Sequence, residues 1–178
     1  FIDLALEDLR RAADLFAPIH ERTRGVDGWV SMEVSPLLAA DTAGTIAAAK
    51  DIYAAAQRRN LFVKIPGTPE GVPAIEEAIF AGVPVNVTLL FSREQYLAAA
   101  EAYLRGIERR IAAGLDPVVE SVASVFVSRW DRALGADLPA ELHNRLGIAT
   151  GGVTYRAYRE LLASQRWQKL AARGAHII

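Results

Sequence analysis

A lysine inside an apolar segment is the residue of this chain with the clearest chemical potential. Lys64 lies within the run 61–65, which is followed by Pro-Gly and the start of a helix. Apolar surroundings disfavour a charged ammonium group, and the neutral amine can attack a carbonyl to form a Schiff base. The alternative is a structural lysine whose stem packs at a strand end while its amine reaches water.

Side-chain alternation places polar residues together on four predicted strands. Successive side chains of a strand point to opposite faces. One face is predicted to carry Ser31, Glu33 and Ser35; Phe62 and Lys64; Asn86 and Thr88; and Ser124, Phe126 and Ser128. The opposite face is predicted to carry Val30, Met32 and Val34; Leu61, Val63 and Ile65; Val85, Val87 and Leu89; and Val125 and Val127. In βα folds, polar groups near the carboxyl ends of strands build sites, so we favour a shared site over a solvated face.

Two of these residues could move protons or hold water beside Lys64. A Glu33 carboxyl group could shuttle protons as a carbinolamine loses hydroxide, and the Thr88 hydroxyl could hold the water involved. The alternative for Glu33 is a simple ion pair with Lys64 that carries no chemistry.

Three further residues suit the binding of a polyhydroxylated carbonyl compound. Asn86 could donate to a substrate hydroxyl, with Ser124 beside it; the alternative for both is that they are satisfied core polar groups. Arg129, near the end of the fourth strand, could clamp a phosphate or could instead pair with Asp131 or Glu120.

Strands and helices alternate in the pattern that would position these residues. An amphipathic helix is expected from Ile2 to about Ile19, with Leu15 and Phe16 on its apolar face and Pro18 near its end. The strands are expected over residues 28–34, around Lys64, and over residues 84–91 and 123–129.

The connecting helices carry recognisable end signals. We expect Asp41 to cap a helix to about Asn60, and a helix with Pro69 at its first position to end at Gly82. Ser92-Arg93-Glu94-Gln95 fits a capping box for a helix ending at Gly114. Two or three helices finish the chain, one weakened by Gly151-Gly152 and the last closed by Gly174.

The spacing of these elements predicts an α/β fold with a parallel sheet. Strand starts about 25–40 residues apart are typical of right-handed βα units. Four strands suit half of an eight-stranded barrel or a small open sheet. No GxGxxG or Walker A sequence follows any strand, which disfavours a nucleotide-binding open sheet.

The composition of the chain disfavours several kinds of binding site and a membrane location. The chain has 178 residues, a formal net charge of −1, no Cys and three dispersed His. These values predict one domain without a disulfide framework, a Cys-based zinc site, a clustered metal site or a nucleic-acid footprint. No apolar run has the length of a membrane span and no signal peptide opens the chain, so a cytoplasmic location is expected.

Four segments of the sequence resemble transaldolase. They are Val30-Ser31-Met32-Glu33-Val34-Ser35-Pro36, Val63-Lys64-Ile65-Pro66-Gly67-Thr68, Asn86-Val87-Thr88-Leu89-Leu90-Phe91-Ser92 and Ser124-Val125-Phe126-Val127-Ser128-Arg129. The resemblance covers nearly the whole chain and is strongest to bacterial enzymes, including those fused to a phosphoglucose isomerase. It implies a partial (β/α)8 TIM barrel, in which residues 1–178 form one partial domain with about strands three to six.

The resemblance also implies a reaction and roles for the residues. Lys64 would form the Schiff base with a ketose phosphate, with Glu33 and Thr88 positioning the catalytic water. Asn86 would bind substrate hydroxyls, and Ser124 and Arg129 would belong to the sugar and phosphate end. The family transfers a dihydroxyacetone unit from sedoheptulose 7-phosphate to glyceraldehyde 3-phosphate in the pentose phosphate pathway, with no metal or organic cofactor.

Some family features are expected outside this chain. The first two strands and the general-base aspartate should precede Phe1, and the last two strands with a second phosphate-binding arginine should follow Ile178. Two alternatives therefore remain: a fructose 6-phosphate aldolase-like enzyme that uses the same lysine, and a non-catalytic barrel fragment. The sequence does not fix the oligomeric state and is compatible with a homodimer.

Overall fold

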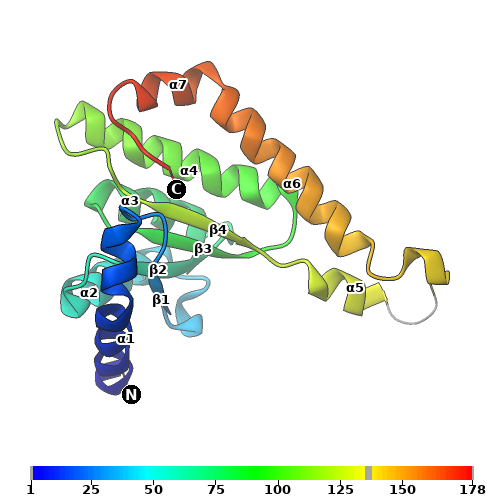
Figure 1. Cartoon of the computed structure of the whole chain (residues 1–178), viewed down its shortest axis with the longest axis horizontal. Helices are drawn as coiled ribbons and strands as arrows, with labels where there is room; N and C mark the ends of the chain where they lie inside the picture. The colour runs from blue at the N-terminus through cyan, green and yellow to red at the C-terminus, as the bar shows by residue number, and fades with distance from the viewer. Residues whose placement is uncertain (1, 135–137, 178) are drawn as a thin grey trace.

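The computed structural model describes residues 2–134 and 138–177 as an α/β fold (Figure 1). The four strands are β1 (Val30–Glu33), β2 (Leu61–Pro66), β3 (Val85–Leu90) and β4 (Ser121–Val125). The α-helices are α1 (Ile2–Arg22), α2 (Thr42–Ala56), α3 (Gly71–Ala81), α4 (Arg93–Ala112), α5 (Ser128–Leu134), α6 (Leu146–Ala163) and α7 (Gln165–Ala171). Two short 3-10 helices, η1 (Pro36–Leu38) and η2 (Ala140–Leu142), complete the described elements.

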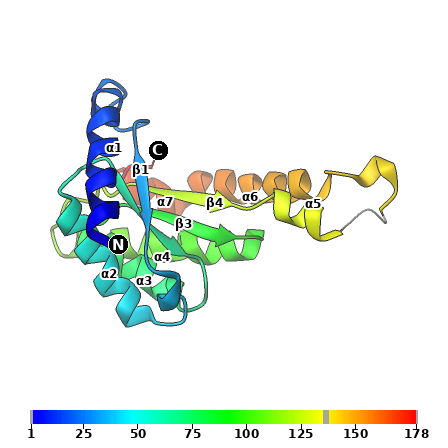
Figure 2. The same ribbon diagram turned by 90° about the horizontal axis from the view of Figure 1, so that it is seen from below.

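The sheet is parallel, and its strands follow one another in chain order. Each strand pairs with the next, giving the order β1-β2-β3-β4. The helices α2, α3 and α4 lie side by side along one face, and α1 lies near the β1 edge (Figure 2). Sequential strands with the crossover helices on one face are typical of a barrel, whereas a doubly wound sheet has helices on both faces. The structure therefore confirms the predicted partial TIM barrel.

The core lies between the sheet and the helices. The strands contribute buried side chains to it, namely Val63, Ile65, Val85 and Val87. The helices α3 and α4 contribute Ile75, Ile79, Ala102 and Ile107. Gly106 allows α3 and α4 to approach closely, because a Cβ at that position would lie 2.7 Å from Cγ2 of Ile79. The aliphatic face of the strands is thus the helix-facing one, as predicted from alternation.

The first helix differs from its predicted packing. Leu6, Leu9 and Ala13 are buried, whereas Leu15 and Phe16, which were predicted to share the apolar face, are 78% and 45% exposed. The prediction for these two residues is wrong. Leu15 follows Leu6 by nine residues, about two and a half turns, so it lies on the side of α1 opposite the buried residues. Phe16 lies nearer to that buried stripe but remains partly exposed.

Most predicted helix ends are confirmed. The Asp41 carboxylate accepts a hydrogen bond from the Gly44 amide at 2.9 Å, and Gly82 ends α3 in the left-handed region at φ +84°. In the predicted capping box, the Ser92 hydroxyl accepts from the Gln95 amide at 3.2 Å. The Gln95 side chain accepts from the Phe91 amide, one residue before the partner that a capping box would use.

Two helices have boundaries that differ from the predicted ones. The regular part of α3 begins at Gly71, two residues after the predicted start at Pro69. Thr68 closes the turn before it, since its hydroxyl accepts from the Gly71 amide at 3.0 Å and its carbonyl from the Val72 amide at 3.0 Å. The helix α2 ends at Ala56, before the predicted Asn60, because Gln57 adopts the left-handed region.

The fourth strand is shorter than predicted. It was predicted over residues 123–129, but β4 covers Ser121–Val125 and α5 begins at Ser128. Ser128 and Arg129 therefore belong to a helix start and do not continue the alternation of the strand. A run of β-branched and aromatic residues such as Val125-Phe126-Val127 cannot by itself show where a sheet ends.

The third strand contains an irregularity that the sequence did not predict. Val87 pairs with Ala123 and Leu90 pairs with Val125, so two residues of β3 lie between these pairs where β4 has one. The strand β3 therefore has one extra residue, which is a β-bulge. Leu89 adopts φ +57°, is partly exposed and does not join Val85 and Val87 in the core. Leu90 is fully buried in its place. The predicted position of Leu89 on the helix-facing side is wrong for this reason.

None of the helices in the described part of the chain combines the length and hydropathy that crossing a bilayer requires.

Candidate active site

Residues from three neighbouring strands meet at one level of the sheet. Glu33 of β1 is the register partner of Lys64 on β2, and Lys64 is the register partner of Asn86 on β3. Neighbouring strands lie about 4.8 Å apart, so these side chains are direct neighbours on the face opposite the helices. Ser124 of β4 adds a fourth member through a hydrogen bond to Asn86. We call Glu33, Lys64, Asn86 and Ser124 the polar row.

Among the described residues, one carboxylate lies within ion-pair distance of the Lys64 amine. Its Nζ lies 3.4 Å from Oε2 of Glu33, and the two side chains are 27% and 47% exposed. An ion pair with this exposure contributes little to stability, typically below about 1 kcal/mol. On the same face of β2, Phe62 stacks on Trp29 with ring centroids 4.1 Å apart. Lys64 is thus a partly buried amine with an acidic neighbour.

The amide of Asn86 is oriented by two hydroxyl groups. The Ser124 hydroxyl donates to Oδ1 of Asn86 at 2.8 Å, and Nδ2 of Asn86 donates to the Ser31 hydroxyl at 3.4 Å. Because Oδ1 accepts the shorter bond, the amide nitrogen is directed towards the side of the row where Ser31 and Lys64 lie. An NH2 group held in this way can donate a second hydrogen bond to a ligand.

Ser31 was missed as a candidate site residue. Alternation places it with Glu33, and this signal was available in the sequence. The structure adds that it contacts Asn86.

Thr88 has a hydroxyl group without a partner. It lies two residues beyond Asn86 on β3, is 1% exposed and is the register partner of Pro66 on β2. Among the described residues, no hydrogen-bond partner reaches its Oγ1. Buried hydroxyl groups are normally satisfied by protein or by ordered water, so this group has an unused capacity for a bound water or a ligand.

Arg129 lies apart from the polar row, at the first turn of α5. Its guanidinium group stacks 4.4 Å above the ring of Phe126. Of its two predicted alternative partners, Asp131 accepts from the Gly147 amide and Glu120 pairs with His176 at 2.9 Å. Within residues 2–134 and 138–177, no carboxylate lies within ion-pair distance of Arg129. A guanidinium group held flat by an aromatic ring remains able to bind an anion through its edge.

The structure therefore brings together some of the predicted residues and not others. Glu33, Lys64, Asn86 and Ser124 form a connected row. Across the part of the chain that the structure describes, no hydrogen bond or ion pair links this row to Thr88 or Arg129. Over the same residues, no group of three or more His, Cys, Asp or Glu side chains could hold a metal ion.

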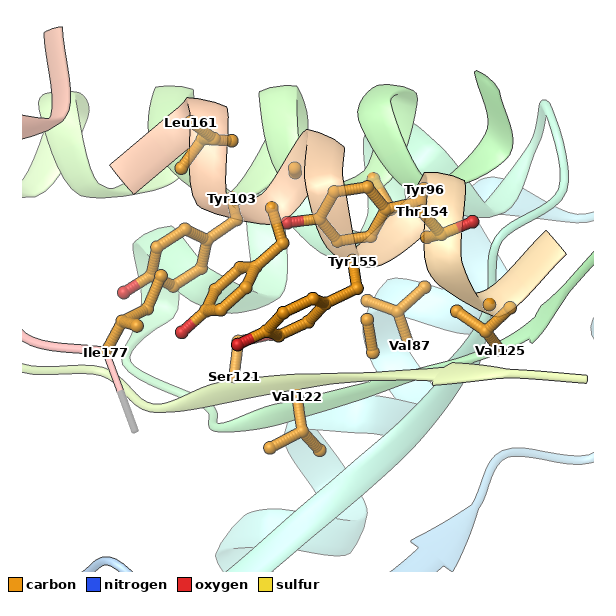
Figure 3. A pocket seen from close by; sticks show the side chains of 15 residues that line it. Val87, Tyr96, Tyr103, Ser121, Val122, Val125, Thr154, Tyr155, Leu161 and Ile177 are labelled. Atoms are coloured by element: carbon orange, nitrogen blue, oxygen red, sulfur yellow. The ribbon is translucent and has the colours of Figure 1, made fainter. Parts of the chain in front are cut away.

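Two cavities among the described residues lie away from the polar row. The cavity in Figure 3 has a volume of about 360 Å³ and lies between β4, α4 and α6, with Tyr96, Tyr103 and Tyr155 around it. Val87 lines it, and alternation places Val87 opposite Asn86. The other cavity, of about 580 Å³, includes His20, Asn60 and Pro84 near the amino ends of the strands. The polar row lies instead on the sheet face opposite α2, α3 and α4, which we call the concave face because it would line the interior of the barrel.

Comparisons with known proteins identify the family of the chain. A protein-family model described as "Transaldolase/Fructose-6-phosphate aldolase" matches residues 1–173. The chain is 47% identical over 178 residues to a transaldolase of Saccharopolyspora erythraea, covering 97% of this chain and 48% of that protein.

Two further relatives give the same result. Transaldolase 1 of Streptomyces avermitilis is 46% identical over 177 residues, covering 95% of this chain and 47% of that protein. A transaldolase of Trichodesmium erythraeum is 42% identical over 188 residues, covering 97% of this chain and 50% of that protein. The chain spans about half the length of these curated relatives.

Proposed function

Because the chain belongs to the transaldolase/fructose-6-phosphate aldolase family, we propose that Lys64 forms a Schiff base with a ketose phosphate and carries a three-carbon unit. The observation that carries this proposal is the contact between Lys64 and Glu33, 3.4 Å apart and flanked by Asn86 in register. A nucleophilic amine, a proton-shuttling carboxyl group and an amide donor are the groups that imine chemistry on a sugar needs.

The proposed reaction begins with imine formation. The Lys64 amine attacks the C2 carbonyl carbon of the ketose, and a proton moves to the oxygen. Glu33 then gives a proton to the leaving hydroxyl group, which departs as water, and a protonated imine remains. Thr88, with its buried and unpartnered hydroxyl, is proposed to hold this water. General acid catalysis of this kind is typically worth about 10²–10⁴-fold in rate.

Cleavage follows from the electron demand of the imine. The electrons of the C3–C4 bond move towards the imine nitrogen as the C4 hydroxyl loses its proton, so an aldehyde leaves and an enamine stays on Lys64. The base for this proton is the family's aspartate, expected outside residues 1–178. A second aldehyde takes up the enamine carbon, and water then releases the new ketose and restores the amine.

We further propose the substrates and setting that the resemblance implies. The donor is sedoheptulose 7-phosphate and the acceptor glyceraldehyde 3-phosphate, in the non-oxidative pentose phosphate pathway of the cytoplasm. Asn86 and Ser124 would hold substrate hydroxyls, and Arg129 would bind the phosphate. The guanidinium of Arg129, stacked on Phe126 and therefore restrained, supports the last assignment.

We also propose that residues 1–178 supply strands three to six of a longer (β/α)8 barrel, called here the complete barrel. The sequential parallel sheet and the double length of the relatives support this. The 178-residue chain alone would then bind substrate weakly or act as a non-catalytic fragment.

Trapping of the imine tests the central step. The chain and the complete barrel are incubated separately with fructose 6-phosphate and borohydride, and adducts are located by mass spectrometry. We expect an adduct on Lys64 in the complete barrel, its loss in Lys64→Ala, and its retention in Lys50→Ala, which removes an exposed lysine of α2. An undiminished adduct in Lys64→Ala would contradict the proposal.

A second assay separates the two activities named in the family description. Transaldolase requires an acceptor aldehyde for turnover, whereas fructose 6-phosphate aldolase releases free dihydroxyacetone. Turnover of fructose 6-phosphate with erythrose 4-phosphate, and little release in water alone, is expected. Equal rates with and without the acceptor would favour the aldolase.

A further inference from the structure

Leu89 has a backbone conformation that is unusual for its position. Four non-glycine residues of the described chain have positive φ, and three of them, Arg24, Gln57 and Asn144, lie in turns or at a helix end. Leu89 lies inside β3, with φ +57°. A bulky side chain makes this region costly, and such strain persists where the surrounding structure imposes it.

Hydrogen bonds on both sides of Leu89 impose the conformation. The Gly67 amide donates to the Thr88 carbonyl at 2.8 Å, and the Phe126 amide donates to the Leu90 carbonyl at 2.7 Å. Leu90 is also anchored, because it is fully buried. Its side chain packs against Gly67 so closely that a Cβ on Gly67 would lie 2.4 Å from Cδ2 of Leu90. The residues before and after Leu89 are thus fixed, and Leu89 absorbs the extra residue of β3.

The extra residue changes which side chains face the site. With regular alternation, Leu90 would follow Asn86 and Thr88 onto the concave face, and Leu89 would enter the core. With the bulge, Leu90 enters the core instead. Leu90 therefore does not follow Asn86 and Thr88 onto the concave face. Bulges near active sites often redirect side chains in this way.

We propose that Leu89 is a positioning residue whose left-handed backbone keeps the Leu90 side chain off the concave face beyond Thr88 and fixes the Thr88 hydroxyl for the water used in imine formation at Lys64. This inference rests on the proposed function. It attributes the role to the backbone conformation of Leu89 and not to its side chain.

Two pairs of variants separate the backbone from the side chain. Leu89→Ile keeps the size and hydropathy of the side chain, but isoleucine is β-branched and poorly compatible with positive φ. Leu89→Asn removes the apolar side chain, but asparagine tolerates positive φ. We expect Leu89→Asn to keep kcat within about threefold and Leu89→Ile to lower it about 10–100-fold, with KM within about twofold, since small misplacements of catalytic groups have effects of this size. The reverse order would overturn the proposal.

A second pair keeps the test decisive if Leu89→Ile fails to fold. Leu89→Gly and Leu89→Ala differ by one methyl group, and glycine alone adopts positive φ freely. We expect the glycine variant to retain the higher kcat in the complete barrel, with thermal unfolding as a control for folding. Equal kcat values in this pair, or a higher value for alanine, would overturn the proposal.

A double-mutant comparison tests whether Leu89 acts through Thr88. In a Thr88→Ala background, changing Leu89 to Ile should lower the rate of borohydride trapping by less than about twofold, because the hydroxyl it positions is gone. The same fold-loss in both backgrounds would overturn the inference. Absence of a Lys64 adduct in the unaltered complete barrel would overturn the proposed function and this inference together. Normal trapping in that barrel, with equal kcat values for Leu89→Asn and Leu89→Ile, would overturn only this inference.

Discussion

The carboxylate of Glu33 lies 3.4 Å from the amine of Lys64, its direct register partner on the neighbouring strand. Because both side chains are partly exposed, the pair adds little to stability, and its main effect is to bring an acid next to a nucleophile. In Glu33→Gln, the acid is lost while the shape is kept. We expect the free energy of unfolding to change by less than about 1 kcal/mol, and kcat to fall roughly 100-fold or more.

Steady-state kinetics and chemical denaturation of the same variant check this expectation. Glu94→Gln is the matched control, because it neutralises an exposed carboxylate at the start of α4, away from the polar row. An unchanged kcat in Glu33→Gln would assign Glu33 to a simple ion pair, the alternative that the sequence left open.

Arg129 should matter for phosphorylated substrates and not for others. A charge-assisted hydrogen bond to a phosphate is worth about 1.5–3 kcal/mol, so Arg129→Gln should lower kcat/KM for glyceraldehyde 3-phosphate at least about tenfold. With glyceraldehyde, which lacks the phosphate, the value should stay within about threefold. Arg132→Gln, on the same helix, is the control. An equal loss with both aldehydes would argue against phosphate binding by Arg129.

Two glycines should respond to alanine in opposite directions. A Cβ at Gly71 would lie 1.9 Å from the carbonyl oxygen of Pro66, at the end of the strand that carries Lys64. Gly152, inside α6, has nothing within 4 Å of its Cβ position. We expect Gly71→Ala to lower the free energy of unfolding by about 1–3 kcal/mol and Gly152→Ala to raise it by about 0.5–1 kcal/mol. Urea denaturation of both variants measures the difference, and destabilisation by Gly152→Ala would contradict the packing of α6.

Buried tyrosines should make the fold sensitive to alkali. Burial, together with the neighbouring Tyr158, raises the pKa of Tyr96 to about 12, and burial likewise raises the pKa of Tyr103. In the unfolded chain these phenols ionise near pH 10. The stabilisation is therefore complete below about pH 10 and is lost as the pH rises towards 12.

Thermal unfolding between pH 8 and 11.5 checks this dependence. The melting temperature should fall above about pH 10, and less steeply in Tyr96→Phe, whose phenyl ring cannot ionise. Tyr155→Phe is the control, because Tyr155 is 60% exposed. A slope that Tyr96→Phe leaves unchanged would assign the alkaline sensitivity to other groups.

Local patterns in the sequence predicted much of the fold and of the candidate site. Alternation placed Glu33, Lys64, Asn86 and Ser124 on one face, because a strand interior repeats every two residues whatever its neighbours are. Asp41 and Ser92 were identified as helix caps, since a cap depends on contacts within one turn. These features require no information from distant parts of the chain.

The features that could not be predicted depend on contacts between distant segments. The left-handed conformation of Leu89 carries no glycine or asparagine signal. It follows from hydrogen bonds of its two neighbours, in which the Gly67 amide donates to the Thr88 carbonyl and the Phe126 amide donates to the Leu90 carbonyl. The position of Arg129 in a helix depends on β4 ending at Val125. Sequence periodicity does not contain this information.

The polar row takes one side chain from each of four consecutive strands. As a result, no single βα unit contains a working part of the site, and correct pairing of all four strands is a precondition for chemistry. Reactivity of Lys64 towards a carbonyl reagent would therefore serve as a reporter of sheet assembly during refolding. Exchange of one unit for that of a relative would alter a quarter of the row, while changes on the outer helices would leave its composition intact.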